Sequence, residues 1–461
     1  MRRHVERTLW ATAFLAVLLA PVLLAPVLHE PSAQPTGVLP SAEPDVNGAS
    51  MLSGLSVGMG LLATSMLVCA VVLPSRLRSL TRTFGIDRVL GIHRFVGLTV
   101  TLLVALHIVL VVAADPSNIA LLDVLHAPDR ARAAVGATMA LAALIALTVL
   151  RRRLQHRYEV WRWVHLALAG AVLVLSALHI WWLNHLVRNA AMRALFIVFA
   201  VGVLGVLAYR WLWLPFLGAR TEYVVREVRP ESSTVSTLVL EPRRRGPRGG
   251  YRALKFTPGQ FAWLRLNPSI GAQEHPFTIA SSAHVGLWTE FTIRHSGDFT
   301  QELRLLRPGN PVWVDGPHGA CTVDLRRTTG LVMIAGGIGI TPMMSMLRTL
   351  AHRRDRRPHR LVVIARSVDE LLFRGEIRQL QQRMEGLIVV ELLRQPPPGW
   401  TGPSGTVDEN LLTTLLPGKC RRDQLDYYLC GPPEMVSAVL IVLDGLDVPH
   451  QRIHTEQFDM V

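Results

Sequence analysis

The feature that most constrains this chain is a series of six long apolar runs in its first half. Each run has about 18–23 residues, the length that a helix needs to cross the ~30 Å hydrocarbon core of a bilayer. None of the runs carries an acidic residue, and no comparable run follows Gly218. The sequence therefore predicts six transmembrane helices within residues 1–218. The runs cover approximately residues 9–28, 51–73, 95–113, 133–150, 163–183 and 194–214.

Basic residues in the connecting segments predict the orientation of these helices. Lys and Arg number three, five and five in the segments 1–8, 74–94 and 151–162. They number none, one and two in the alternate segments 29–50, 114–131 and 184–193. The positive-inside rule then places both termini in the cytoplasm. The first run also resembles a signal peptide, but its cleavage would leave the remaining topology unchanged.

Composition excludes several other classes of protein. The net charge is +14, from 48 Lys and Arg against 34 Asp and Glu. These arginines flank apolar runs or are scattered, so we expect no nucleic acid partner. The four cysteines, Cys69, Cys321, Cys420 and Cys430, form no Cys-x-x-Cys pair. We therefore expect neither an iron–sulfur cluster nor a disulfide framework.

Two of the predicted helices carry histidines at matched spacing. Span three has His93 and His107, and span five has His165 and His179; each pair is 14 positions apart. On a helix this spacing puts both members on one face, about 21 Å apart. Because both spans run in the same direction, His93 lies level with His165 and His107 with His179. Facing neutral imidazoles suit haem iron, so we predict two haem b groups. The alternative is that each histidine bonds only to a neighbouring helix.

The second half of the chain has two further patterns. Residues 219–325 read as short strands separated by Gly and Pro turns, which predicts a small antiparallel β-barrel. Residues 326–461 alternate strands with helices, which is typical of a parallel α/β nucleotide-binding domain.

A glycine-rich turn in the α/β domain is a candidate phosphate-binding loop. GGIGITP (residues 336–342) follows a strand and opens a helix. Its glycines and the helix N-terminus suit a pyrophosphate. Thr341 is expected to cap the helix, with Pro342 at its first position. A purely structural turn between strand and helix is the alternative.

Five motifs in a fixed order carry a resemblance to a known family. They are His275-Pro276-Phe277-Thr278, Gly297-Asp298-Phe299-Thr300, GGIGITP, Cys430-Gly431-Pro432-Pro433 and the near-terminal Phe458. This set is similar to the ferredoxin–NADP reductase module. With six spans and paired histidines, residues 50–461 resemble the NADPH oxidase and ferric reductase family. The resemblance implies a transmembrane di-haem bundle (1–218), an FAD-binding β-barrel (219–325) and an NAD(P)H-binding α/β domain (326–461).

The resemblance also implies roles for the motif residues. Residues 275–278 hold the flavin of FAD, with Thr278 near the ring and His275 near the phosphates, and residues 297–300 receive the FAD pyrophosphate. The nicotinamide dinucleotide is held by Gly336, Gly337, Gly339 and Thr341, with Gly431 and Pro432 nearby. The residues expected at hydride transfer are Thr278, Cys430 beside the nicotinamide, and Phe458 stacked on the flavin. The alternative for Phe458 is a core position in a terminal strand.

The preference for NADPH or NADH depends on Arg366 and Ser367, which follow the strand LVVIA where the adenosine ribose is expected. A guanidinium there can bind the 2′-phosphate of NADPH. The alternative is an ion pair of Arg366 with Asp369 or Glu370, and NADH then serves as well.

Together these features predict a multi-pass oxidoreductase of the cell membrane, with both termini and the FAD and NAD(P)H domains in the cytoplasm. Electrons would pass from NADPH through FAD and two haems to an acceptor outside. Short outer loops that carry Arg188 and Arg193 favour a small acceptor, oxygen giving superoxide. A ferric chelate and a separate extracytoplasmic redox protein are the alternatives. A haem-free binding or sensor protein would require the histidine pattern to be accidental.

Overall fold

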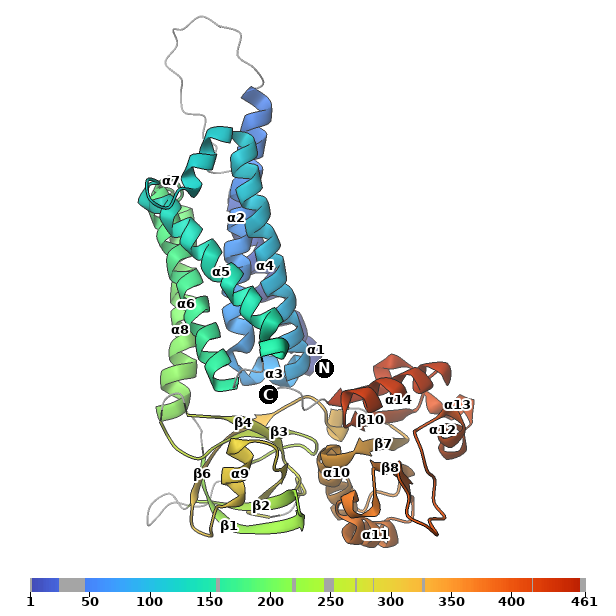
Figure 1. Ribbon diagram of the computed structural model, residues 1–461. Coiled ribbons are helices and arrows are strands. Elements are labelled where there is room, and N and C mark those ends of the chain that lie inside the picture. Colours follow the sequence, from blue (N-terminus) through green and yellow to red (C-terminus); the bar gives the residue numbers. More distant parts are fainter. Residues whose placement is uncertain are drawn as a thin grey trace, which may run out of the picture. The chain divides into compact units, whose positions relative to one another are not determined.

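The computed structural model describes residues 2–24, 46–154, 158–217, 221–243, 253–269, 272–284, 286–325, 328–416 and 418–456. The chain divides into two compact units, Met1–Trp213 and Leu214–Val461. The first unit is a bundle of helices, and the second contains two β-sheets (Figure 1).

Among the described residues, six helices of the first unit are long and apolar enough to cross a membrane, in agreement with the six predicted spans. Short elements join them: η2 (Leu73–Ser75), α3 (Arg78–Phe84), η3 (Pro116–Leu122) and α7 (His185–Arg188). The long helices are α1 (Arg2–Leu24), α2 (Val46–Val72), α4 (Ile86–Ala114), α5 (Asp129–Leu154), α6 (Tyr158–Leu183) and α8 (Ala190–Ala208). A π-helical segment, η4 (Tyr209–Leu217), continues α8.

The surface of the bundle has the character expected of a lipid-facing protein. Phe95, Leu102 and other large apolar side chains of the long helices are exposed. Trp163 and Trp181 are exposed near the two ends of α6, about 27 Å apart along the helix axis. Tryptophans favour the two interfaces of a bilayer, and this separation is close to the thickness of its apolar core.

The first sheet of the second unit is an antiparallel barrel, as predicted. Its strand order is β4-β3-β6-β1-β2-β5. The residue after β4, Ile279, forms a bridge with Phe291 of β5, which closes the barrel. Tyr223, Leu240, Phe291 and Val314 fill its core. The strands are β1 (Thr221–Ser232), β2 (Val235–Pro242), β3 (Phe261–Arg265), β4 (His275–Thr278), β5 (Thr289–Arg294) and β6 (Pro311–His318), with α9 (Asp298–Arg304) between β5 and β6.

The second sheet is wholly parallel, as predicted, with strand order β11-β10-β7-β8-β9. Buried apolar residues on both of its faces pack against helices. Its strands are β7 (Gly330–Gly336), β8 (His359–Ala365), β9 (Leu387–Leu393), β10 (Leu425–Cys430) and β11 (Ile453–Glu456). Its helices are α10 (Ile340–His352), α11 (Arg374–Arg383), α12 (Glu409–Leu415), α13 (Lys419–Arg422) and α14 (Pro433–Gly445).

Candidate functional site

The parallel sheet brings two of the predicted motifs together at its carboxyl edge. The chain runs from β7 to β8 and β9 in one direction, and β10 and β11 then lie on the other side of β7. Open α/β sheets bind ligands beside such a switch point, at the carboxyl ends of the strands. Gly336 ends β7, and Cys430, which pairs in register with Ala335, ends β10. The GGIG turn and the Cys430-Gly431-Pro432 turn are therefore neighbours.

Close packing between these two turns requires their glycines. A Cβ at Gly339 would overlap the Cys430 carbonyl, and a Cβ at Gly431 would lie 3.0 Å from the Gly336 backbone nitrogen. Gly337 has a φ of +55°, in the left-handed region that favours glycine. Packing of one turn on the other is a sufficient reason for these glycines.

The predicted cap of α10 is wrong. The helix begins at Ile340 with Gly339 as its N-cap residue, so Thr341 and Pro342 lie inside the first turn. The Thr341 hydroxyl, in a residue only 1% exposed, donates to the Ile338 carbonyl at 2.9 Å. The 3₁₀ turn Gly337–Gly339 leads directly into the helix, and this continuous winding leaves no extended residue at Thr341 to act as a cap.

In the barrel, the HPFT strand and the GDFT helix meet through their aromatic rings. The His275 and Phe299 ring centroids are 4.4 Å apart, and Phe277 is nearly parallel to Phe299 with centroids 6.2 Å apart. Thr278 is 3% exposed, and its Oγ1 has no hydrogen-bond partner among the described residues. A buried hydroxyl is costly to leave unpaired, so this position fits a ligand with polar ring atoms, such as a flavin.

The turn before α9 is held by a side chain of its own helix. Thr300 Oγ1 accepts from the backbone N–H groups of Ser296 and Gly297, each at 3.0 Å. Asp298, in the first turn, is exposed and adds a negative charge there. Arg294, at the end of β5, supplies the opposite charge: its Nη2 would lie 3.1 Å from a Cβ at Gly337.

Arg294 is a candidate that the sequence motifs did not identify. Arg294 is exposed, and its guanidinium reaches from the end of β5 to the nucleotide turn at Gly337. The available sequence signal was a basic residue at the end of a strand, three positions before Gly297.

Of the two alternatives for Arg366, the ion pair is the one that this structure contains. Arg366 Nη2 donates to Glu370 Oε1 at 2.8 Å, and the Arg366 side chain is 66% exposed. Ser367 follows as the residue before the 3₁₀ turn Val368–Glu370.

The two remaining candidates for hydride transfer are Cys430 and Phe458. The Cys430 thiol is completely buried at the switch point, next to the GGIG turn. Phe458 lies outside the described residues.

In the helical unit, the first predicted histidine pair comes together. The ring centroids of His93 and His165 are 6.3 Å apart, with the rings tilted by 57°. Bonds of about 2 Å from each imidazole nitrogen to one metal ion between them correspond to ring centroids roughly 6 Å apart. His107 and His179, the second predicted pair, are close enough to interact electrostatically.

Three of these four imidazoles are oriented by a backbone carbonyl. His93 Nδ1 donates to the Ala70 carbonyl at 3.1 Å. His107 Nδ1 donates to the Ser56 carbonyl at 2.8 Å, and His179 Nδ1 donates to the Arg130 carbonyl at 2.8 Å. Each ring then has its Nε2 available as a neutral ligand. This arrangement is typical of metal-bound histidine. Nδ1 of His165 is buried without a partner among the described residues.

Helix α2 is built to receive the two histidines of α4. The Ala70 carbonyl would normally accept from the residue four positions on, which is Pro74 and has no N–H to give. Near the other histidine, a Cβ at Gly60 would lie 3.3 Å from the ring of His107, so glycine gives this ring its space. Proline and glycine in an apolar run were the sequence signals for these contacts.

The histidines occur as pairs rather than in a larger ligand cluster. Within the described ranges, no group of three or more His, Cys, Asp or Glu side chains converges. Trp161 packs on His165 with centroids 5.2 Å apart, and Arg162 lies over Trp163 and Trp211. Paired imidazoles, three of the four with an Nδ1 atom held by a backbone carbonyl, fit a haem, which takes its other ligands from the porphyrin.

Three family descriptions match consecutive parts of the chain. Residues 59–176 match "Ferric reductase like transmembrane component", residues 243–321 match "FAD-binding domain", and residues 333–440 match "Oxidoreductase NAD-binding domain". The chain is an oxidoreductase with FAD- and NAD-binding modules attached to a membrane domain.

Individual relatives match part of the chain in sequence. The reductase component of propane 2-monooxygenase from Mycolicibacterium smegmatis is 28% identical over 53% of this chain and 69% of that protein. NADH-cytochrome b5 reductase 1 from Aspergillus terreus is 31% identical over 36% of this chain and 57% of that protein. Flavohemoglobin from Malassezia yamatoensis has a TM-score of 0.50 and 17% identity over 89% of this chain and 99% of that chain, a likeness of fold alone.

Proposed function

Because this chain has the three-part domain architecture of the NADPH oxidase and ferric reductase family, we propose that it carries electrons across a membrane. Cytoplasmic NADPH, with NADH as a possible substitute, is the donor. FAD and two haem b groups carry the electrons, and an acceptor on the outer face receives them. Oxygen is the proposed acceptor. A ferric chelate is the second candidate, favoured by the ferric reductase-like match of residues 59–176.

When bound, FAD takes two electrons as a hydride and passes them singly to haem iron. The chain's own residues provide binding and orientation. We assign Thr278 Oγ1 to a polar atom of the flavin ring, since this hydroxyl is buried and unpartnered within the described ranges. Pro276 and Phe277 are proposed to support the flavin between Thr278 and His275, and His275 is proposed to lie near the phosphates of FAD. Residues 297–300, together with Arg294, face its pyrophosphate.

The nicotinamide dinucleotide is assigned to the switch point of the parallel sheet. Gly336, Gly337, Gly339 and Thr341 line the turn that opens α10, whose N-terminus favours a negative charge. Arg366 and Ser367 then face the adenosine ribose. Cys430, Gly431 and Pro432 lie on the neighbouring strand end, beside the nicotinamide. Phe458 is proposed to stack on the flavin.

The observation that carries the haem assignment is the orientation of the paired histidines. His93 with His165, and His107 with His179, would each hold one haem iron between α4 and α6. A histidine that merely bonded to a neighbouring helix would need no second imidazole facing it. The backbone carbonyls that accept from Nδ1 raise the basicity of the bound imidazoles.

The basic residues of the bundle support the proposed assignment of its cytoplasmic side. Arg78 begins α3, Arg88 and Arg94 lie in the first turns of α4, and Arg151 lies in the last turn of α5, all on one side of the predicted membrane. By the positive-inside rule this side is cytoplasmic. The haem propionates are proposed to pair with Arg94 or Arg162.

A substitution of one ligand tests the haem proposal. His107→Ala in the full chain should remove about half of the haem and abolish electron transfer to the outer face, while NAD(P)H still reduces the flavin. His126→Ala is the matched control, because His126 is exposed in a loop and pairs with Asp123. Haem is measured by its reduced-minus-oxidised spectrum per mole of FAD.

Two outcomes would contradict the assignment. One is a full haem content in the His107→Ala protein. The other is an equal loss of haem in the His126→Ala protein, which would mean that haem content follows general stability rather than ligation.

A further inference from the structure

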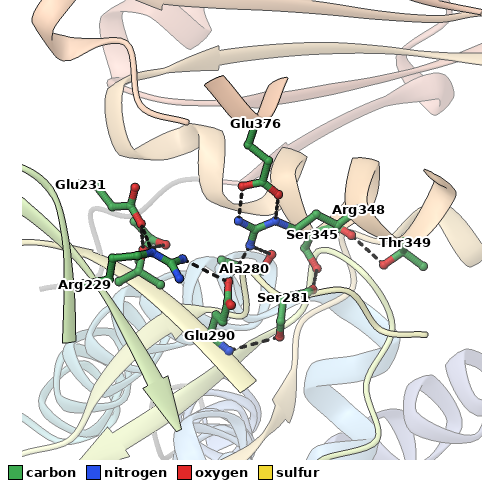
Figure 2. A network of polar contacts seen from close by, with 11 residues as sticks. Arg229, Glu231, Ala280, Ser281, Glu290, Ser345, Arg348, Thr349 and Glu376 are labelled. Carbon is green, nitrogen blue, oxygen red and sulfur yellow. Dashed lines mark hydrogen bonds and ion pairs between the residues drawn. The ribbon is translucent and has the colours of Figure 1, made fainter. Parts of the chain in front are cut away.

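A buried arginine joins the nucleotide-binding domain to the flavin barrel within the second unit. Arg348 lies on α10, two turns after the GGIG turn, and is only 9% exposed. Its Nε and Nη2 donate to the two carboxylate oxygens of Glu376 on α11, each at 2.6 Å. Its Nη1 donates to the Ala280 carbonyl at 2.8 Å and to Glu290 Oε2 at 2.9 Å, both in the barrel (Figure 2).

The barrel segment that Arg348 contacts continues directly from the flavin strand. Ala280 is two residues after Thr278, the end of β4. The next residue, Ser281, accepts from the Ser345 hydroxyl at 2.9 Å through its carbonyl, and Ala283 N–H donates to Thr349 Oγ1 at 2.9 Å. Positions 345, 348 and 349 share one face of α10. This face of α10 therefore forms hydrogen bonds with the backbone of the segment that follows the HPFT motif.

The charges around Arg348 fix the position of its guanidinium and keep it protonated. Although burial by itself lowers the pKa of the Arg348 guanidinium, hydrogen bonds and charge from Glu376 and charge from Glu290 raise it above its ordinary value. On the barrel side, Arg229 Nη2 lies 3.8 Å from Glu290 Oε2 and helps to fix that carboxylate. Arg348 is thus permanently charged and held on both sides by acidic partners.

The geometry points to Arg348 as a positioning residue that sets the distance between bound NAD(P)H and the flavin. This inference rests on the NAD(P)H-to-FAD step of the proposed function. One end of α10 opens at the nucleotide turn, and its middle is fixed to the chain that continues from the flavin strand. Hydride transfer requires reacting atoms about 3–3.5 Å apart, and an error of about 1 Å can slow it roughly a hundredfold. Arg348 contacts neither ligand site, so it acts through the docking of one domain on the other.

Two conservative variants separate this role from general stability. Arg348→Lys keeps the charge but loses the two-pronged contact, and Glu290→Gln removes the carboxylate charge that faces Arg348 across the domains and Arg229 within the barrel. Arg374→Gln is the control, since Arg374 pairs with Glu391 inside the nucleotide-binding domain. The full chain, solubilised in detergent and loaded with FAD, is assayed with NAD(P)H and ferricyanide, which takes electrons from the flavin.

We expect both test variants to lower kcat roughly ten- to hundredfold, with KM within about threefold of the wild-type value and FAD content unchanged. The deuterium isotope effect with 4-deuterated NAD(P)H should rise, because hydride transfer becomes the slow step. Arg374→Gln should change kcat by less than about twofold.

An unchanged kcat in both variants would overturn the inference. So would a fall in kcat that tracks loss of FAD, or one with the wild-type isotope effect. Ferricyanide takes electrons directly from the flavin, so this assay does not depend on the haems or on the outer acceptor. If either of those were missing, the proposed function would be contradicted, but the test of Arg348 would still be valid.

Discussion

At the scale of single residues, Arg366 has two competing partners. Its ion pair with Glu370 is exposed, and such surface pairs contribute only about 0–1 kcal/mol. Charge-assisted hydrogen bonds to a phosphate contribute about 1.5–3 kcal/mol. A 2′-phosphate would therefore displace Glu370. We expect Arg366→Ala to raise KM for NADPH roughly ten- to hundredfold and to leave KM for NADH nearly unchanged.

NADH serves as the internal control for this substitution, because the two dinucleotides differ only at the 2′ position. Steady-state rates with each are measured on the same preparation. If KM rises equally for both, Arg366 acts on the fold of the turn after β8 and has no specific role toward the phosphate.

Residue-level patterns predicted the partners that lie at helical spacing, but not those that depend on packing. The equal 14-residue spacing of histidines in two helices predicted that His93 lies level with His165, and their ring centroids are 6.3 Å apart. The contact of His93 with the Ala70 carbonyl depends on which helix packs beside α4, and the sequence gives no direct measure of that. From the sequence alone, Arg348 is an ordinary basic residue of an amphipathic helix. Its buried network exists only once two domains meet.

At the scale of elements, the amino end of the parallel sheet contains a pH-sensitive pair. His359 begins β8 and is completely buried, and burial lowers the pKa of its imidazole. Its Nε2 lies 3.4 Å from Asp355 Oδ1. Although burial alone raises the pKa of Asp355, hydrogen bonds from the side chain and backbone of Arg357 lower it to about 2.

The two shifts act in different pH ranges. Unfolded histidine binds a proton at a pH of about 6.5, above the lowered pKa of folded His359, so stability falls as the pH drops below that value. The loss reaches at most about 1.4 kcal/mol per pH unit for one proton. Unfolded aspartate protonates near pH 4, so the stability that depends on Asp355 is lost between about pH 4 and pH 2.

We expect the Tm of the solubilised chain to fall between pH 6.5 and 5, and His359→Gln to make that fall shallower, because glutamine does not titrate. Scanning fluorimetry at half-unit pH steps measures the Tm of the wild-type and variant proteins. His450→Gln is the matched control, since the His450 side chain is 82% exposed. Equal slopes in the wild-type and His359→Gln proteins would exclude this histidine as the source.

Element types were predicted more completely than element ends. Long apolar runs, short alternating strands and the change to strand–helix alternation all gave the observed architecture, because each reflects a periodicity of burial. The start of α10 was misplaced, since the 3₁₀ turn through Gly339 has no distinct sequence signal. The edge strand β11 is only four residues long, and its pairing with β10 depends on the finished sheet.

At the scale of the whole molecule, the proposed path ends at the outer side of the bundle. The described elements that connect helices there are the short η3 and α7. The loops have roughly 22, 18 and 10 residues, and a folded substrate-binding domain needs about 50 or more. The site of the last electron transfer is therefore expected to be open to a small molecule that needs no built pocket.

Of the two candidate small acceptors at this outer surface, we propose oxygen. It is small and uncharged, and the exposed Arg188 and Arg193 can stabilise superoxide as its negative charge forms. The same charges attract anionic ferric citrate, so both acceptors must be compared directly.

We expect NADPH oxidation by the full chain in aerobic detergent solution, with dye reduction that superoxide dismutase suppresses, and little turnover under anaerobic conditions. Replacing both arginines with glutamine should slow this reaction several-fold and leave ferricyanide reduction at the flavin unchanged. Anaerobic turnover that ferric citrate restores, without dismutase sensitivity in air, would identify a ferric reductase instead. Negligible turnover with both acceptors, in a protein that has its haem, would mean that an extracytoplasmic redox protein is the physiological acceptor.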